Sequence, residues 1–539
     1  MKNTNTLLSI TNLKKYFPIA KSSIFQREQL YVRANEEITI DIQSGETFGL
    51  VGESGCGKST LGRTILQLYD QTAGSTLYYG RTLEEFPAAY VEVTLKNAGK
   101  MLAKYNKLQN KADACAKECE EAGEKATFFQ HQNKNLTAAE AETAFQNVVK
   151  VMGGFAALDN YSEGVKMLLK QYYASKKLCQ VKEAQRDLDG EIAFQTAIAD
   201  EWKADEKAKS PKAKINRAMK KAAAAQAKKD RLQPALQAAE AELAAAKQEV
   251  ATLKKTYANN EAFARLDAMQ DNGIDLGRLK YSEMRQLRKD IQIIFQDPYS
   301  SLNPRMTVGQ IIGEGLITHR FFKRGNNKMK EYILKVMDQC GLQDYMLHRY
   351  PHQFSGGQRQ RICIARALAV KPKFIVCDEC VSALDVSIQS QIINLLEELK
   401  EKENLTYLFI SHDLSVVRYI SDRIGVMYLG NMVEMGDAAE IFKDPRHPYT
   451  VALLSSIPTT DTEALKKERI ILEGNIPSPI KPPSGCKFHT RCYMACEKCK
   501  RVPPPTVEVA PGHKVVCHFP EQKLDENGNY LFQISQEEA

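Results

Sequence analysis

Long apolar runs are what this 539-residue sequence most clearly lacks. No stretch of 18 or more apolar residues occurs, which excludes a helix that spans a bilayer. The opening MKNTNTLLSITNLKKYF has no apolar core of useful length and no small-residue cleavage site, so no secretory signal is expected. Lys and Arg (74) exceed Asp and Glu (66) by only 8, a balance that permits an anionic partner without requiring one. We therefore expect a cytosolic protein that meets a membrane only at its surface.

Proline is scarce in one segment, residues 84–276, which holds three prolines and is rich in Ala, Lys and Glu. This composition predicts long helices. An apolar heptad near its end predicts that two of them pack as an antiparallel hairpin; its positions are Leu236, Ala239, Leu243, Ala246, Val250, Leu253 and Tyr257. Two interpretations of the segment stay open, a solvated helical decoration and a docking arm for a partner. The chain is also too long for one hydrophobic core, so two or three domains are expected.

The stretch VGESGCGKST, residues 51–60, fits the phosphate-loop pattern G-x-x-x-x-G-K-[ST]. An apolar strand pattern precedes it and a helical pattern follows it, which is the context that a true phosphate loop requires. Backbone N–H groups of the loop and the helix N-terminus form an anion site. Lys58 would neutralise phosphate charge, the Ser59 hydroxyl would bind Mg²⁺, and Thr60 would reach the α-phosphate. The predicted phosphate-binding residues are Gly52, Glu53, Ser54, Gly55, Cys56, Gly57, Lys58, Ser59 and Thr60.

Two further motifs extend this site. FIVCDEC is an apolar strand that ends in Asp378 and Glu379, which predicts carboxylates at the edge of a sheet beside the metal. Asp378 would hold Mg²⁺ through water, and Glu379 would orient or deprotonate the attacking water. FSGGQRQRICIARAL opens a second glycine-rich helix although the chain has one phosphate loop; the residues at its start are Ser355, Gly356, Gly357 and Gln358.

The motifs follow one another in the order of the ATP-binding cassette (ABC) family, which the sequence resembles. Gln296 in IIFQDP matches the Q-loop, Asp385 in SALD matches the D-loop, and His412 in YLFISHDLS matches the switch histidine. The glycine-rich helix start matches the signature motif. KKYF supplies an aromatic residue, Tyr16 or Phe17, where the family stacks adenine, and the spacing favours Phe17.

This resemblance implies an α/β fold of the P-loop NTPase class, of ABC type. Such a fold has a mixed sheet in a RecA-like core, an antiparallel β lobe and a helical signature subdomain. The cofactors implied are ATP and Mg²⁺, with the metal held through Ser59, Asp378 and Gln296. Glu379, His412 and Gln296 are the implied catalytic residues. In the family the signature helix binds the γ-phosphate of ATP held by a partner, which implies a dimer.

Longer stretches such as FQDPYSSLNPRMTVG and HPYTVALLSSIP resemble the oligopeptide/dipeptide importer ATPases, most of all the F-type subunit. This likeness implies a second, D-type ABC ATPase, two membrane permeases and, indirectly, an extracellular peptide-binding protein. It also implies a peripheral position on the cytoplasmic face of the membrane and no nucleic-acid partner. We expect a nucleotide-binding domain in two parts (1–83 and 277–455), a helical insertion (84–276) and a Cys-rich C-terminal module (456–539).

The sequence departs from the family at two places. Cys380 stands where the family has a proline after the catalytic glutamate. This departure bears on the expected turnover rate and not on the expected fold. The insertion is absent from the usual pattern. Insertion at a surface turn of the β lobe is tolerated because loop-closure entropy grows only logarithmically with length.

The C-terminal segment is rich in cysteine. Thiolates in a reducing compartment favour metal binding over disulfides, and 13 scattered cysteines without a signal indicate such a compartment. The spacing is not that of a zinc finger, and the likeness to the importers suggests a [4Fe–4S] cluster, with Zn²⁺ or unmetallated thiols as the alternatives. The candidate ligands are Cys486, Cys492, Cys499 and Cys517, with Cys496 as an extra thiol.

A DNA-acting ABC ATPase of the SMC or excision-repair kind is the alternative function. SMC-like coils leave the cassette between the Q-loop and the signature, whereas this insertion precedes Gln296. The excision-repair proteins carry two cassettes, and this chain has one. The insertion also lacks the interleaved basic and aromatic residues that strand binding requires.

Overall fold

The computed structural model describes residues 5–21, 29–123, 126–204, 211–322, 327–457, 470–520, 523–524 and 530–531. The chain divides into two compact units. One, here the split unit, is formed by Met1–Gly80 together with Tyr281–Ala539, and the other, the helical unit, is Arg81–Lys280. The segment expected to be inserted, 84–276, lies inside the helical unit. Within the described ranges, no helix combines the length and the apolar character needed to cross a bilayer.

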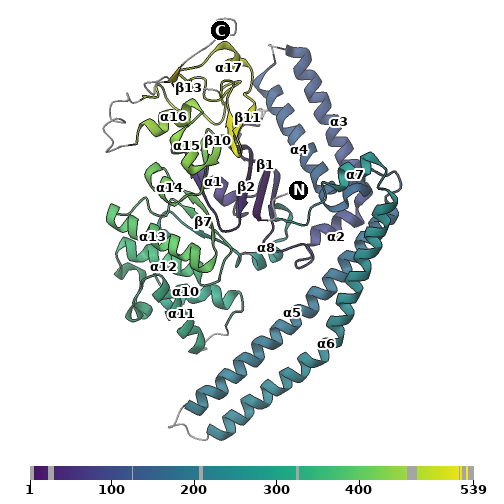
Figure 1. Cartoon of the computed structure of the whole chain (residues 1–539), viewed down its shortest axis with the longest axis vertical. Helices are drawn as coiled ribbons and strands as arrows, with labels where there is room; N and C mark the ends of the chain where they lie inside the picture. Colours follow the sequence, from purple (N-terminus) through teal and green to yellow (C-terminus); the bar gives the residue numbers. More distant parts are fainter. Residues whose placement is uncertain are drawn as a thin grey trace. The chain divides into compact units, whose positions relative to one another are not determined.

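An eight-stranded mixed sheet is the centre of the split unit (Figure 1), with the strand order β11-β12-β10-β9-β3-β8-β7-β6. The inner strands β3, β7 and β8 are buried along their whole length, so both faces of the sheet are covered. The pairs from β9 to β6 are parallel, and the pairs from β9 to β11 are antiparallel. The strands are β3 (Thr47–Val51), β6 (Ile291–Ile294), β7 (Phe374–Asp378), β8 (Thr406–Ile410), β9 (Arg423–Tyr428), β10 (Asn431–Asp437), β11 (Thr506–Ala510) and β12 (His513–Val516).

The parallel part of the sheet brings the motifs to one edge. Parallel strands have their carboxyl ends on the same side. The phosphate loop follows β3, Asp378 ends β7, His412 follows β8, and Gln296 follows β6. Residues from four separate parts of the sequence therefore meet because of strand order alone.

A second, antiparallel sheet pairs β1 (Thr6–Pro18) with β2 (Tyr31–Gln43) and with β4 (Ala73–Tyr78). The α-helices of the split unit are α1 (Lys58–Ile65), α8 (Tyr281–Leu287), α9 (Pro298–Ser301), α10 (Val308–Thr318), α11 (Asn327–Gln339), α12 (Gly356–Leu368), α13 (Val386–Glu403), α14 (Leu414–Ile420), α15 (Ala438–Lys443), α16 (Pro448–Ser455) and α17 (Glu497–Arg501). Residues of α10 to α16 form a large apolar core together with Val51 of β3 and Cys377 of β7.

The helical unit contains two pairs of long helices, of which α3 (Ala98–Ala122) and α4 (Phe128–Met152) form the shorter pair. The longer pair, α5 (Ser162–Ala204) and α6 (Pro211–Thr256), runs side by side along most of its length (Figure 1). A narrow seam holds it together, in which Ala239, Leu243 and Ala246 of α6 pack on Ala174 and Leu178 of α5. Small residues in the seam let the two backbones approach closely. The other elements are α2 (Ala89–Lys96), α7 (Glu261–Asp267) and the short strand β5 (Ile274–Asp275).

The chain enters and leaves the helical unit at neighbouring points. The N–H of Leu83 donates a hydrogen bond of 3.1 Å to the carbonyl of Asn272. The two ends of this segment are therefore adjacent in space.

Candidate nucleotide site

Glycines give the phosphate loop its shape. Gly52, Gly55 and Gly57 have φ values of 146°, 81° and 103°, a region that other residues rarely adopt. Gly57 is also the N-cap of α1, and a Cβ atom there would lie 2.1 Å from the carbonyl oxygen of Ala34. The loop therefore passes so close to β2 that only glycine fits.

Lys58 forms hydrogen bonds with the backbone of its own phosphate loop. Its side chain is buried, and Nζ donates to the carbonyls of Gly52 (2.7 Å) and Glu53 (3.1 Å). Carbonyl oxygens are weaker partners for an ammonium group than phosphate oxygens, since phosphate carries a full charge. The lysine is thus held at the loop and able to exchange these bonds for contacts to an anion.

Asp378 lies at the end of β7 with its side chain 1% exposed. Its Oδ2 accepts a hydrogen bond from Arg63 at 3.1 Å. Its Oδ1 is buried and has no hydrogen-bond partner among the residues that the structure describes. A buried carboxylate oxygen without a partner is costly. A water molecule on a Mg²⁺ ion would satisfy it, so the residues present fit the metal that the family implies.

The side chains of Gln296 and His412 both approach the carboxylate of Glu379. Its Oε2 lies 2.7 Å from Nε2 of Gln296, which donates, and 3.6 Å from Nδ1 of His412. Glu379 has a φ of 49°, which turns the side chain at the end of the strand, and its N–H donates to Ile410. The neighbouring Cys380 is buried. This arrangement of a carboxylate, an amide and an imidazole can orient a water molecule and accept its proton.

The residues of the signature stretch begin α12. Ser355 is its N-cap, and its hydroxyl accepts from the N–H of Gln358 in a capping box. Gly357 packs against α13, since a Cβ atom there would lie 2.5 Å from Ile388. Asp385 is the N-cap of α13, is exposed and makes no capping bond with its side chain. The next residue, Val386, is 80% exposed, so this end of the helix presents an accessible surface.

The two aromatic candidates for adenine lie differently. Tyr16 is buried, and its hydroxyl donates to Glu36. Phe17 is half-buried and meets the ring of Tyr69 edge-on at 5.4 Å between centroids. Lys15 lies 4.6 Å from the centre of the Phe17 ring.

Four cysteines of the C-terminal segment line one small cavity of about 20 Å³, together with His447, Phe488 and His489. They are Cys486, Cys492, Cys499 and Cys517. Burial raises the pKa of Cys492 to about 12 and that of Cys517 to about 11, so without a metal these thiols keep their protons at neutral pH. Cys496 lies with its sulfur 3.7 Å from that of Cys499. In the described part of the chain, no three His, Cys, Asp or Glu side chains are arranged as a formed metal site.

The sequence did not predict two contacts to the phosphate loop. Arg491 forms a bidentate ion pair with Glu53, at 2.8 and 3.0 Å. The hydroxyl of Tyr449 accepts a hydrogen bond of 2.9 Å from the N–H of Glu53. Neither residue belongs to a nucleotide-binding motif, and the stretch HPYTVALLSSIP that contains Tyr449 indicates only the importer branch, so no local pattern pointed to these contacts.

A phosphate loop, a strand ending in two acids and a capped glycine-rich helix define an ATP-binding cassette. A family model described as "ABC transporter" matches residues 35–274 and 261–382, and one described as "Oligopeptide/dipeptide transporter, C-terminal region" matches residues 433–499. The chain belongs to the ABC transporter family, in its oligopeptide/dipeptide branch, and is an ATP-hydrolysing protein of that family.

Individual relatives support this assignment. "Oligopeptide transport ATP-binding protein AppF" of Bacillus subtilis (strain 168) is 55% identical over 251 residues, which cover 46% of this chain and 75% of the relative. "Oligopeptide transport ATP-binding protein OppF" of Salmonella typhimurium is 50% identical over 246 residues, 46% of this chain and 73% of the relative. A solved dimeric ATP-binding cassette with ADP and phosphate has a TM-score of 0.40 at 16% identity over 80% of this chain and 99% of its own, too low to support an argument.

Proposed function

We propose that this protein hydrolyses ATP to power a membrane importer of oligopeptides or dipeptides. The cargo class rests on the relatives, which are named as oligopeptide transport ATP-binding proteins. The observation that carries the ATPase chemistry is the meeting of Gln296 and His412 at Glu379, on the sheet edge that also bears the phosphate loop. The named relatives are transport proteins, which favours this function over a DNA-acting ATPase.

The site residues have the following proposed roles. Lys58 and the loop N–H groups bind the phosphates, and Phe17 rather than the buried Tyr16 stacks on adenine. Ser59, Asp378 and Gln296 hold Mg²⁺, which supplies charge neutralisation at the phosphates. Glu379 takes a proton from the attacking water while Gln296 and His412 orient that water and the γ-phosphate.

We propose that the chain works as one half of a dimer with a second ABC ATPase of the D type. Ser355, Gly356, Gly357 and Gln358, with Asp385, would then complete the partner's nucleotide site. The exposure of Asp385 and Val386 supports an intermolecular role for this end of α13.

Coupling to the membrane would use the surface between Gln296 and Ser355. The segment NPRMTVGQIIGEGL, which leads into α10, would receive a helix from one of two permeases. The protein would therefore be peripheral on the cytoplasmic face of the membrane, with an extracellular peptide-binding protein as an indirect partner.

We propose four segments, a nucleotide-binding domain at 1–83 and 277–455, an insertion at 84–276 and a Cys-rich module at 456–539. The compactness of Arg81–Lys280 supports the insertion.

In the last segment we propose a [4Fe–4S] cluster or Zn²⁺ on Cys486, Cys492, Cys499 and Cys517. The support is that the four thiols line one common cavity. The group would be structural.

The test is purification of tagged Glu379→Gln protein from detergent-solubilised membranes with ATP, followed by identification of the co-purifying chains. Without hydrolysis the closed dimer persists, so we expect a second ABC subunit and two multi-span permeases. Glu398→Gln, which changes an exposed acid on α13, is the matched control and should retain fewer partners. A homodimer that carries nucleic acid would contradict the proposal.

A further inference from the structure

The phosphate loop is anchored by residues that belong to none of the nucleotide-binding motifs. Its second residue, Glu53, is held at three points. Arg491 binds the carboxylate, Tyr449 accepts the backbone N–H, and Lys58 donates to the backbone carbonyl. Glu53 is thus the point at which the C-terminal segment reaches the nucleotide site.

The contact from Arg491 is strong by its geometry. Both terminal nitrogens bind the carboxylate, one to each oxygen, which fixes the orientation of the pair as well as its distance. The Arg491 side chain is 6% exposed and that of Glu53 is 25% exposed. Because the pair is largely shielded from water, it is screened less than a surface ion pair.

The segment that carries Arg491 is itself fixed on the split unit. Phe488 is 1% exposed and packs its ring against Tyr428 and Tyr449, at 5.1 and 5.3 Å between centroids. Nζ of Lys487 donates to Asn431 at 2.5 Å. Arg491 therefore extends from a rigid support and not from a free loop.

The three contacts differ in what happens when ATP binds. Lys58 must leave the carbonyls of Gly52 and Glu53 to reach the phosphates, which removes two hydrogen bonds that hold the loop. The contact from Arg491 uses only the carboxylate of Glu53, which is not among the groups proposed to bind the phosphates. It can therefore hold the loop after the lysine has left these carbonyls.

We infer that Arg491 is a positioning residue of the nucleotide site, which holds Glu53 so that the phosphate loop keeps its ATP-binding shape after Lys58 turns to the phosphates. A preorganised loop loses less conformational entropy when the ligand arrives, so the contact should tighten binding. Arg491 does not contact Glu379 or the water proposed to attack the γ-phosphate, so its contact with Glu53 should leave the rate of the chemical step unchanged.

The experiment measures ATP binding and hydrolysis by the purified full chain carrying Arg491→Met. We expect the Kd for ATP to rise about tenfold, equivalent to about 1.4 kcal/mol, while kcat stays within about twofold of the wild-type value. Arg491→Lys keeps the charge and one hydrogen bond, so it should recover part of the affinity. Lys500→Met breaks an exposed ion pair with Glu497 in the same segment and is the matched control, with no change expected.

A double variant separates positioning from general stability. If Arg491 acts through Glu53, Glu53→Gln combined with Arg491→Met should weaken ATP binding no more than the larger of the two single changes. Additive losses would overturn the inference. So would a folded Arg491→Met protein with wild-type Kd, or one whose kcat falls while its Kd is unchanged.

Tyr449→Phe is the second test and also serves if Arg491→Met does not fold. It keeps the buried ring and removes only the hydroxyl that binds the N–H of Glu53. A severalfold rise in the Kd for ATP supports an anchor at Glu53, and an unchanged Kd overturns it. These measurements use no cargo and no permease, so their outcome is independent of the transport that we propose.

Discussion

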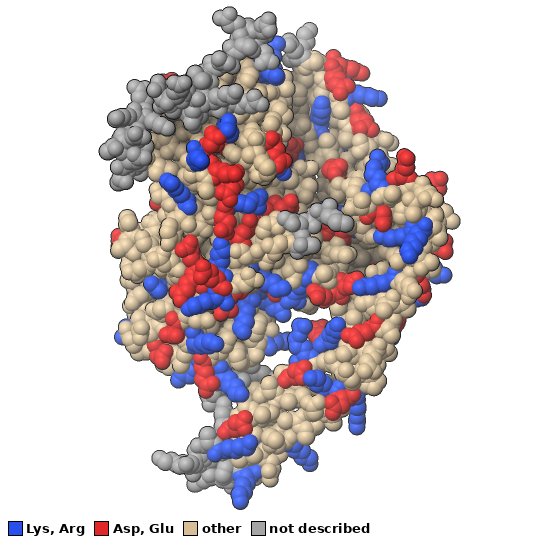
Figure 2. Space-filling model, viewed as in Figure 1, with Lys and Arg blue, Asp and Glu red and all other residues tan. Residues whose placement is uncertain are grey.

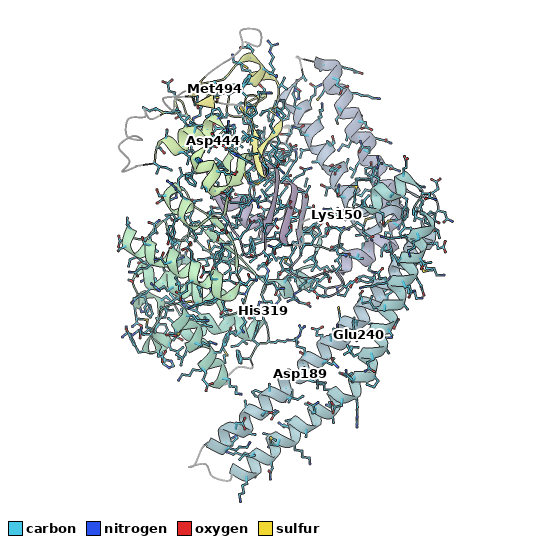
Figure 3. All side chains as sticks on the ribbon, viewed as in Figure 1. Lys150, Asp189, Glu240, His319, Asp444 and Met494 are labelled. Atoms are coloured by element: carbon cyan, nitrogen blue, oxygen red, sulfur yellow. The ribbon has the colours of Figure 1, made fainter. Side chains whose placement is uncertain are left out.

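The ion pairs that link α5 to α6 in the helical unit differ in burial from those beside the nucleotide site in the split unit. In the helical unit, Lys170–Glu249, Lys177–Glu242 and Lys182–Glu240 link α5 to α6, and every partner is at least 42% exposed. Figure 2 shows both signs of charge spread along this hairpin. Asp189 projects from α5 and Glu240 from α6, each within reach of a lysine on the other helix (Figure 3). Such exposed pairs contribute about 0–1 kcal/mol each.

In the split unit, ion pairs fix functional groups. Lys14–Glu36 is almost fully buried, Arg63 holds one oxygen of Asp378, and Arg491 holds Glu53. The seam of the helical unit consists of alanine and leucine, whereas in the split unit these ion pairs fix the orientation of buried or half-buried charged groups. We therefore expect a residue change beside the nucleotide site to alter ATP binding or hydrolysis far more than a change in the helical unit. Four predictions test this expectation.

The largest effect is expected at Glu379. Glu379→Gln removes the proton acceptor and keeps the shape of the side chain, so kcat should fall by about 10²–10⁴-fold while ATP still binds. Phosphate release and ATP binding by the purified chain measure the two quantities. Glu240→Gln, which changes an exposed acid of α6, is the control in the other unit. Hydrolysis by Glu379→Gln at the wild-type rate would show that the proposed chemistry is wrong.

Gly57→Ala should have the next largest effect. A Cβ atom at this position meets the Ala34 carbonyl, and φ is 103°. The strain alone amounts to about 1–3 kcal/mol. We expect a lower melting temperature and at least tenfold weaker ATP binding, both measured on one protein sample. Wild-type affinity would mean that the loop tolerates a shape other than the one described.

Gly190→Ala, in the middle of α5, is the matched change in the helical unit, and its effect should have the opposite sign. Apart from the backbone of the helix itself and the two neighbouring residues, no heavy atom lies within 4 Å of the added Cβ. Alanine restricts the unfolded chain, so the helix should gain about 0.5–1 kcal/mol. Hydrogen exchange of the α5 amides should slow, with ATP hydrolysis unchanged. Faster exchange would show that the glycine serves a purpose that its surroundings do not explain.

Removal of most of the helical unit should leave ATP binding almost unchanged. Because Leu83 and Asn272 are hydrogen-bonded neighbours, a linker of a few Gly and Ser residues can replace the chain between them. The Kd for ATP should stay within about twofold of the wild-type value. A loss of ATP binding by a folded shortened chain would contradict the proposed insertion at 84–276.

Local patterns predicted the elements that depend on neighbours in the sequence. The apolar run before Gly52 and the helical spacing after Lys58 indicate β3, the loop and α1 because each element is only a few residues long. The heptad through Leu243 indicates the seam of α6 for the same reason.

Contacts between distant residues could not be predicted in this way. Whether Tyr16 or Phe17 faces outward depends on irregularities in the pairing of β1 with β2, one of which falls between Lys15 and Tyr16. The partners of Glu53 are equally invisible, because nothing near Tyr449 or Arg491 indicates a nucleotide. Only the fold brings these side chains together.

The ion pair of Arg491 with Glu53 joins residues 438 positions apart in the chain. At about 5–20 residues per second, a ribosome needs roughly 20–90 s to pass from one to the other. The whole helical unit is synthesised in that interval. The phosphate loop therefore leaves the ribosome well before the anchor at Arg491 is made. A chain that stops before residue 491 contains every motif of the ATPase but lacks the contact that holds Glu53.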